Sequence, residues 1–304
     1  MTWLAWRVQR SSILASVSAV SLVGVWLVAG GFALHHSTNA ARWTELDVAM
    51  LFALPCFVGL AVGAPLVGEE LDRGTVRLAW SQEASRGRWL GSKLLVATAA
   101  IGPPFALLAG LVGWWSRTLA VPDSLFTGVG IAPADFDVTG PAFVSYALFA
   151  FALGILLGAL LGRPIWAFVA GVPTYVAVRS AVQELLRPRM IPPLRFVDRT
   201  GDVPAALTHA WVFNAAWQAS GPTARGAAPP TLGGLPESVM RCVAQPGHPP
   251  TIAACARLLR LQYTGLYQPP DRYWVLQGIE SAIFLALAFA LCALGALAVR
   301  HHSV

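Results

Sequence analysis

The chain is short of charged side chains. Only 12% of its 304 residues are charged, whereas about a quarter of the residues of a soluble domain usually are. Hydrophobic residues make up 56% of the sequence, and the mean hydropathy is +0.61. This composition excludes an ordinary water-soluble domain. It predicts an integral membrane protein, which requires apolar segments of roughly 20 residues each.

The sequence also lacks the common motifs of catalysis and nucleotide binding. Its six histidines show no HExxH spacing, no carboxylate pair accompanies them, and no GxxxxGK[ST] loop is present. The chain is therefore expected to bind no metal and to be no enzyme, so that another chain must bind any ATP and Mg²⁺ that the protein uses. The net charge of +6 comes from basic residues beside apolar segments. This placement argues against nucleic acid as a partner.

Cysteines are few, four in all. Cys56 and Cys292 fall within apolar segments, where a cysteine usually acts as a small buried hydrophobic residue. Cys242 and Cys255 lie in a polar segment that we expect to be extracellular, and an oxidising compartment permits a disulfide. We expect a disulfide between Cys242 and Cys255, and the alternative is a pair of free thiols.

Six apolar segments are long enough to cross a membrane. Four have no charged residue, the fifth contains Arg179 and Glu184, and the sixth contains only Glu280. Their boundaries are residues 11–34, 48–68, 94–116, 138–162, 164 to about 186, and 273–299. A signal peptide is the alternative for the first segment, but the run is too long and lacks a small-residue cleavage site. The predicted fold is an all-α polytopic membrane protein with six transmembrane helices and one long extracellular loop between helices 5 and 6.

Basic residues predict the orientation of these helices. Short loops rich in Arg and Lys tend to stay in the cytoplasm. Five such residues lie in the loop 68–93, whereas the loops 35–47 and 117–137 contain one Arg each. We therefore expect both termini to be cytoplasmic and the chain to lie in the cell membrane, in contact with lipid.

Three regions are expected along the chain. Residues 1–186 contain a short interfacial helix in "MTWLAWRVQR" and helices 1 to 5, and residues 273–304 contain helix 6 and a cytoplasmic tail. Residues 187–272 between them form the extracellular loop. This loop is rich in Pro and Gly, as in "GPTARGAAPPTLGGLP", so we expect irregular structure with at most short helices near 205–216 and 252–263.

Two charged residues inside the predicted helices need partners. Arg179 lies about two turns from the outer end of the fifth segment, and Glu280 lies at a similar depth in the sixth. An isolated charge at such a position costs several kcal/mol. We expect an intramembrane ion pair between Arg179 and Glu280. Pairing of Arg179 with Glu184 and a contact with substrate are the alternatives.

The loop 68–93 carries nine of the chain's 21 basic and 15 acidic residues, in the order "GEELDRGTVRLAWSQEASRGRWLGSK". Gly74 permits a turn, and Thr75 can cap a short helix "VRLAWSQ" that lies along the membrane surface. Ser85 and Arg86 then lead back to the next apolar segment. A loop that only sets orientation is the simpler alternative, but it explains the charges and not this order of turn, cap and return.

The loop resembles the one between the second and third membrane helices of type-2 ABC exporter permeases, where an acidic-R-G-T element is followed by Ser-Arg and by Lys at the next helix. "RGTVRLAWSQEASRGRWLGSKL" and "YQPPDRYWVLQGIESAIFLALA" together are similar to six-helix permeases of GC-rich bacteria, and one Lys against twenty Arg fits such a genome. The resemblance implies a coupling helix that docks on a separate ATPase subunit. The residues expected to form this dock are Glu70, Asp72, Arg73, Gly74, Thr75, Arg77, Leu78, Trp80, Glu83, Ser85 and Arg86.

The resemblance also implies a function. We expect the membrane subunit of an ABC transporter that exports an amphipathic compound, paired with a second permease copy or paralogue and with cytoplasmic ABC ATPase subunits. This chain would bind no cofactor, and the partner ATPase would bind ATP and Mg²⁺. Many type-2 exporters have a small outer connection where this chain has residues 187–272, so the substrate stays open. The alternative function is a membrane-anchored sensor or assembly protein whose extracellular loop binds a ligand.

Overall fold

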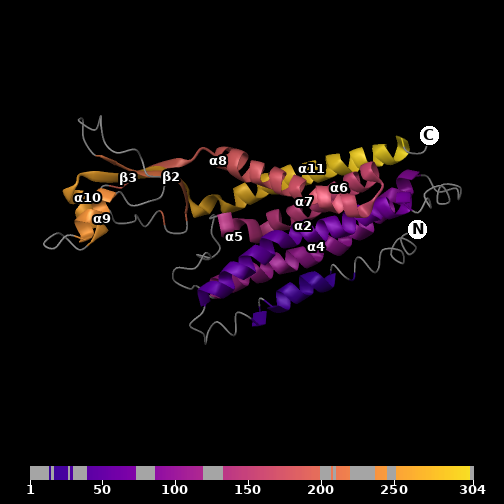
Figure 1. Ribbon diagram of the computed structural model, residues 1–304, viewed down its shortest axis with the longest axis horizontal. Coiled ribbons are helices and arrows are strands. Elements are labelled where there is room, and N and C mark those ends of the chain that lie inside the picture. Colours follow the sequence, from indigo (N-terminus) through magenta and orange to yellow (C-terminus); the bar gives the residue numbers. More distant parts are fainter. Residues whose placement is uncertain are drawn as a thin grey trace. The chain divides into compact units, whose positions relative to one another are not determined.

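The computed structural model in Figure 1 describes most of the chain, and its described residues form two units. The described residues are 14, 17–26, 28–29, 40–72, 86–118, 133–198, 207, 210–219, 237–244 and 251–301. Contacts between Cα atoms separate a helical unit from a sheet unit. The helical unit is Met1–Val129, Ala134–Met190 and Trp274–Val304, and the sheet unit is Gly130–Pro133 and Ile191–Tyr273.

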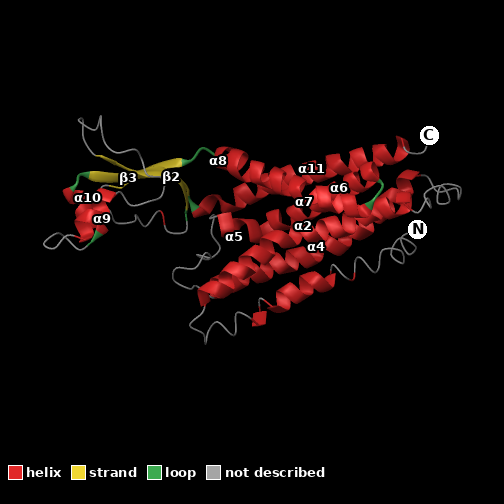
Figure 2. Ribbon diagram, in the orientation of Figure 1, coloured by secondary structure: helices red, strands yellow, loops and turns green. Residues whose placement is uncertain are grey.

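Long apolar helices make up the helical unit (Figure 2). In chain order its elements are α2 (Ala40–Asp72), α4 (Arg86–Thr118), α5 (Pro133–Val138), α6 (Gly140–Leu161), α7 (Pro164–Ala181), a π-helix (Val182–Leu186), α8 (Arg187–Met190) and α11 (Tyr273–His301). Five described segments are long and apolar enough to cross a membrane: Met50–Glu69, Gly91–Trp114, Gly140–Leu161, Pro164–Met190 and Pro270–Val299. They correspond to the second through sixth predicted spans. The first predicted span, 11–34, is described only in part, by the apolar helix Val17–Trp26, so a count of six stays a prediction.

Glycines allow α2 and α6 to pack very closely. A methyl group at Gly59 would lie 2.6 Å from Cβ of Ala150, and one at Gly158 would lie 2.6 Å from the backbone oxygen of Ala64. At Gly63 it would meet the backbone oxygen of Phe151 still more closely. Small residues four apart are how membrane helices bring their backbones together. The two helices therefore interlock over several turns, and α4 and α7 pack beside them (Figure 1).

A tight corner joins α6 to α7. Gly162 has φ of 63°, a left-handed conformation that glycine adopts without steric cost, and its N–H donates to the oxygen of Gly158 at 3.0 Å. Arg163 then precedes Pro164, which occupies the first turn of α7, where a missing N–H costs nothing. The two helices consequently run antiparallel, with the start of α6 and the end of α7 at the same end of the bundle.

The sheet unit corrects two expectations for the long loop. Its strands β1 (Leu194–Asp198), β2 (Trp211–Ala219) and β3 (Leu261–Gln268) form an antiparallel sheet in the order β1-β3-β2. The loop is therefore not simply irregular, and a helix near 205–216 is wrong, because aromatic and β-branched residues in that stretch favour a strand. Asn214, with φ of 51°, lies at a bulge where the pairing with β3 shifts register.

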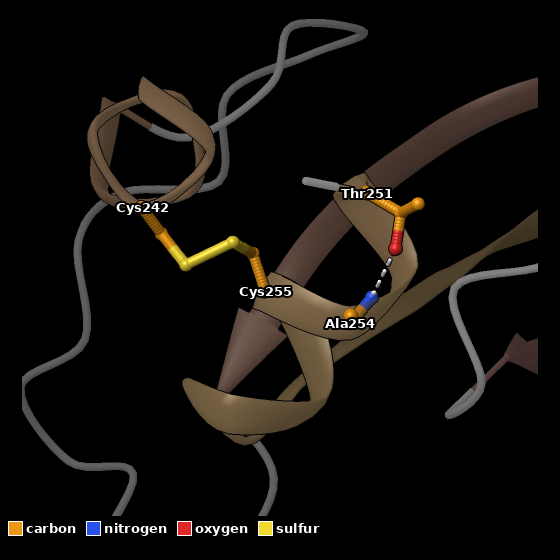
Figure 3. The surroundings of a disulfide bond; sticks show 4 residues. All are labelled: Cys242, Thr251, Ala254 and Cys255. Atoms are coloured by element: carbon orange, nitrogen blue, oxygen red, sulfur yellow. Dashed lines mark hydrogen bonds between the residues drawn. A yellow bond between two sulfur atoms is a disulfide. The ribbon is translucent and has the colours of Figure 1, made fainter. Parts of the chain in front are cut away.

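Two short helices beside the strands are joined by a disulfide. They are α9 (Glu237–Ala244) and α10 (Ile252–Leu258), and the second agrees in place with the helix expected near 252–263, although the chain turns to β3 after it. Cys242 and Cys255, with Cα atoms 5.9 Å apart, form the disulfide expected from the sequence (Figure 3). Thr251 caps α10 by accepting a hydrogen bond from the N–H of Ala254 at 3.3 Å. The cysteines pack with Val239 and Leu261 in a small apolar core.

Candidate functional site

A sharp corner between α5 and α6 positions the first acidic group of the candidate site. Gly140 has φ of 69°, a left-handed conformation that glycine adopts without steric cost and that lets the chain turn between α5 and α6. The hydroxyl of Thr139 donates to the backbone oxygen of Asp135 at 2.6 Å and so holds the corner. Asp137, on α5, is fully buried within the helical unit. A buried carboxylate requires cationic or hydrogen-bonding partners.

Arg187 and Glu280 form the centre of the site. Nε of Arg187 donates to Oε2 of Glu280 at 2.8 Å, and Nη2 of the same side chain lies 2.7 Å from Oε1. The hydroxyl of Tyr146 donates to Oε1 of Glu280 at 2.6 Å. The side chains of Arg187 and Glu280 are each 1% exposed. This two-point contact fixes the start of α11 against α8, because paired N–H groups match both carboxylate oxygens.

Asp137 connects this pair to a second arginine. Its Oδ1 accepts from Nη2 of Arg187, and its Oδ2 lies 3.3 Å from Nη2 of Arg179. Arg179 also donates to the backbone oxygen of Phe52 on α2 at 3.2 Å, and its guanidinium lies 4.5 Å from the ring centroid of Tyr146. Two carboxylates and two guanidinium groups thus meet inside the bundle. We call Asp137, Tyr146, Arg179, Arg187 and Glu280 the ion cluster.

The predicted pair of Arg179 with Glu280 is corrected by this geometry. Both residues belong to the ion cluster, but the cation that contacts Glu280 is Arg187, and Arg179 contacts Asp137 instead. Glu184, the alternative partner of Arg179, is exposed. The prediction went wrong because it placed Arg187 in the extracellular loop. The helix in fact continues through Met190 and carries Arg187 into the bundle.

The π-helix between α7 and α8 explains how one chain segment supplies both arginines. In an α-helix, eight residues separate Arg179 and Arg187 by about 80° around the axis. A π turn closes i→i+5 hydrogen bonds and therefore rotates less for each residue. The π-helix Val182–Leu186 reduces the angular offset between the two side chains. Both guanidinium groups can then contact the same carboxylate, Asp137.

Gln277 ties α11 to the corner between α5 and α6. Thr139 holds the N-cap position of α6 but makes no side-chain cap. The N–H of Ala142, in the first turn, instead donates to Oε1 of Gln277 at 2.9 Å. The amide of Gln277 in turn donates to the backbone oxygens of Phe136 at 2.8 Å and Thr139 at 3.2 Å. A side chain of α11 therefore caps α6, satisfying a group that a helix start leaves unpaired.

The ion cluster is neutral overall, and nothing in it is arranged for covalent chemistry. Two acids and two arginines balance, so the cluster avoids the cost of an uncompensated charge within the membrane-spanning region. Its hydrogen bonding is nevertheless incomplete: among the described residues, Nη1 of Arg187 and Nε of Arg179 have no hydrogen-bond partner. Within that same part of the chain, no group of three or more His, Cys, Asp or Glu could hold a metal ion. The arrangement suits a structural contact that holds helices together.

The predicted coupling loop lies largely outside the described residues. The structure describes no part of 73–85, nor the side chains of 70–72 and 86–90. It does show that α2 continues through Asp72 and that α4 begins at Arg86. The proposed dock on an ATPase therefore stays a prediction for each of its residues.

Three residues of the ion cluster were missed from the sequence: Asp137, Tyr146 and Arg187. Asp137 and Arg187 each lie within two residues of a predicted span boundary, and such charges look like ordinary loop residues. Periodicity offered one usable signal. Gln277, Glu280 and Ser281 interrupt an otherwise apolar run, three and four residues apart, and so lie on one face of the last helix.

Comparison with known families gives one match. The family model described as "ABC-2 membrane transporter related" matches residues 8–187, which is more than half of the chain. The comparison with curated proteins found no significantly similar sequence. The matched region includes the loop 68–93 and the cluster residues Asp137, Tyr146, Arg179 and Arg187, and it ends before Glu280.

Proposed function

The chain belongs to the family of ABC-2 membrane transporter related proteins, and from this membership we propose that it is the permease subunit of an ABC exporter driven by a separate ATPase. It is a multi-pass membrane protein of the permease type, with five candidate spans among the described residues. The observation that carries the proposal is the family match. The resemblance of the loop 68–93 to coupling loops supports the finer statement about the ATPase.

In this proposal the chain performs no covalent chemistry. The partner ATPase binds ATP and Mg²⁺, and its closure pushes on the coupling loop. Movement of the helices then switches the substrate path between the two sides of the membrane, a change of population between two states that differ in their contacts. Two permease chains, identical or paralogous, would enclose that path. The long apolar faces of α7 and α11 are suited to contact lipid or the second permease.

A membrane-anchored sensor is the other function considered from the sequence. It would use the helices only as an anchor and the sheet unit as a ligand-binding domain. The family match does not favour it, because the matched residues 8–187 contain only Gly130–Pro133 of the sheet unit and none of its strands. Transport of an amphipathic compound outwards, with both termini in the cytoplasm, is the more specific form of the proposal.

Co-purification tests the proposal directly. A tagged chain extracted from its native membranes in mild detergent should bring with it a soluble ATPase that has a GxxxxGK[ST] motif. Replacing Gly74 with Val, or exchanging Glu83 and Arg86, preserves net charge and should leave membrane insertion near normal. Both variants should lose coupling, measured as a loss of ATPase stimulation after reconstitution into lipid vesicles. A loop that only sets orientation needs only its positive charge, so both variants would then stimulate the ATPase as the unchanged chain does.

Gly91 provides a matched control, because it lies on α4, beyond the last residue expected to form the dock, Arg86. Gly91 lies near the start of α4, and a methyl group there would meet no atom within 4 Å. Gly91→Val should therefore leave ATPase binding and turnover unchanged. If no ATPase accompanies the chain in any detergent, the permease assignment loses its functional basis. If Gly74→Val and Gly91→Val behave alike, the coupling role of the loop is wrong while the permease assignment stands.

A further inference from the structure

The last helix, α11, is one of the less buried helices of the bundle. In the membrane-spanning window of α11, 22% of the residues are buried, against 67% for α6. The backbones of α2 and α6 approach so closely that a methyl group at their glycines would collide, whereas at Gly295 on α11 a methyl group would lie 3.6 Å from Cα of Leu156 on α6, an ordinary contact distance. Large apolar side chains such as Phe289, 78% exposed, lie on its open face. Side chains rather than interlocked backbones therefore hold α11 in place.

The polar contacts of α11 with other helices are concentrated near its start. Gln277 caps α6, and Glu280 binds Arg187 and Tyr146. One turn farther, Phe284 packs edge-on against Tyr146, with ring centroids 4.8 Å apart. Beyond that point the contacts of α11 with the core are apolar, as at Val299. Apolar contacts restrain a helix weakly inside a membrane, because lipid chains offer a similar environment.

We propose that Gln277 and the Arg187–Glu280 pair form a releasable latch, and that α11 swings away from α6 at this end during the transport cycle. This inference rests on the proposed transport function and names the element that moves in it. The latch is Arg187, Gln277 and Glu280. Its opening separates Glu280 from Arg187 and lets water reach the freed carboxylate, while Arg187 keeps its contact with Asp137.

The chemistry of the latch suits release. A buried ion pair gains Coulomb energy but loses the hydration of both ions, so its net contribution to stability is small when water can enter. The unpaired Nη1 of Arg187 makes the closed state less than fully satisfied. Arg187 also keeps an acidic partner after opening, because Asp137 accepts from it as well as pairing with Arg179, so that only Glu280 has to be solvated anew. A small free-energy difference between closed and open states is what a nucleotide-driven partner can overcome.

A rigid reference lies next to the moving helix. Substituents at Gly59 or Gly158 would collide with the facing backbone or Cβ, so α2 and α6 cannot slide or separate without losing close contacts along their length. The proposal therefore predicts different behaviour for two pairs of helices. The distance from α11 to α6 changes in the cycle, and the distance from α2 to α6 does not.

Distances between spin labels measure this difference. In a chain with Cys56→Ser and Cys292→Ser, one label pair is Val275→Cys with Leu160→Cys, and the reference pair is Met50→Cys with Leu160→Cys. All three positions are exposed, at 56%, 53% and 45% for Val275, Leu160 and Met50. ATP with vanadate, added to the complex with the co-purified ATPase, should shift the first distance distribution by several ångströms and leave the second unchanged.

The same distance measurement on variants of the isolated chain needs neither nucleotide nor partner. Arg187→Met with Glu280→Gln removes one charge of each sign and should shift the Val275 distribution towards the open distance in the isolated chain. An unchanged Met50 distribution shows that this variant is folded. If it does not fold, Gln277→Leu leaves every ion pair in place, removes the other polar contact of the latch and should give a smaller shift. Exchange of the two charges is unsuitable, because it would place an acid against Asp137.

The outcomes are separable. The latch is wrong if the Val275 distribution is the same with and without nucleotide in a complex that hydrolyses ATP, and the same in the variants. It is equally wrong if both label pairs shift together, because this indicates general loosening. Failure to obtain any ATPase complex counts against the proposed function. The distance measurement on variants of the isolated chain then still tests the latch.

Discussion

Arg187 and Glu280, 93 residues apart in the sequence, meet through two hydrogen bonds of 2.8 and 2.7 Å inside the helical unit. Because both side chains are 1% exposed, the effect of removing one should differ from that of removing both. Arg187→Leu leaves Glu280 and Asp137 with a single cation between them, and should destabilise the fold by about 3–5 kcal/mol. Arg187→Leu with Glu280→Leu leaves Asp137 balanced by Arg179 and should cost clearly less.

Thermal unfolding of the detergent-solubilised chain, followed by size-exclusion chromatography, measures this prediction. The single variant should melt at a lower temperature than the double variant. Equal melting temperatures would mean that the two charges do not depend on each other. Glu184→Leu is a suitable control, because Glu184 is an exposed acid on the adjoining π-helix and its removal should change the melting temperature little.

Gln277 makes a second prediction possible. Gln277→Leu keeps the approximate size of the side chain but leaves the N–H of Ala142 and the oxygen of Phe136 without this partner. Each unsatisfied buried group costs about 1–3 kcal/mol, so the variant should melt earlier, and amide exchange in the first turn of α6 should quicken. Gln277→Glu keeps the acceptor but loses the donor, and its effect should be smaller at the Ala142 amide. Uniform exchange across α6 in both variants would contradict the capping role.

The spans were predictable from the sequence because burial in lipid demands long apolar runs, and composition alone reveals these. The described spans Met50–Glu69 and Gly140–Leu161 agree closely with the predicted runs 48–68 and 138–162. The end of the span Pro164–Met190 was not predictable in the same way. A run of apolar residues stops at Leu186, yet the helix goes on, because the charge of Arg187 is compensated inside the bundle and does not need water.

The sheet unit shows a second limit. Its many Pro and Gly residues suggest a loop without regular structure, and the strand "WVFNAAWQA" overlaps the short helix predicted near 205–216. Strand pairing depends on residues far away in the chain, since β2 pairs with β3 some fifty positions later, at Trp211 with Gln268 and at Ala219 with Leu261. Local patterns cannot supply such a partner. A disulfide is easier to anticipate, because only two candidate cysteines occur in this unit.

That disulfide gives a third prediction. Cys242→Ser with Cys255→Ser removes a cross-link that closes a sequence separation of 13, and loss of a loop constraint of this size costs about 3 kcal/mol. Amide exchange should quicken in α9 and α10, whereas exchange in α6 should stay the same. Mass analysis of unreduced protein after alkylation provides the control: wild type should take up no alkyl group at these two cysteines. Two alkylated thiols there would show that the bond is absent.

The glycines between α2 and α6 support the last prediction. Alanine favours a helix over glycine by roughly 0.5–1 kcal/mol where space is open. At Gly110 on α4 a methyl group would meet nothing within 4 Å, so Gly110→Ala should leave the melting temperature unchanged or raise it. At Gly63 the methyl group would collide with the backbone oxygen of Phe151, which cannot rotate away as a side chain can. Gly63→Ala should therefore lower stability by about 1–3 kcal/mol, the usual cost of overpacking. The same chemical change thus has opposite signs at the two sites, and thermal unfolding of both variants measures it. If Gly63→Ala proved as stable as Gly110→Ala, α2 and α6 would not be interlocked, and α2 would lose its value as the fixed reference for the movement of α11.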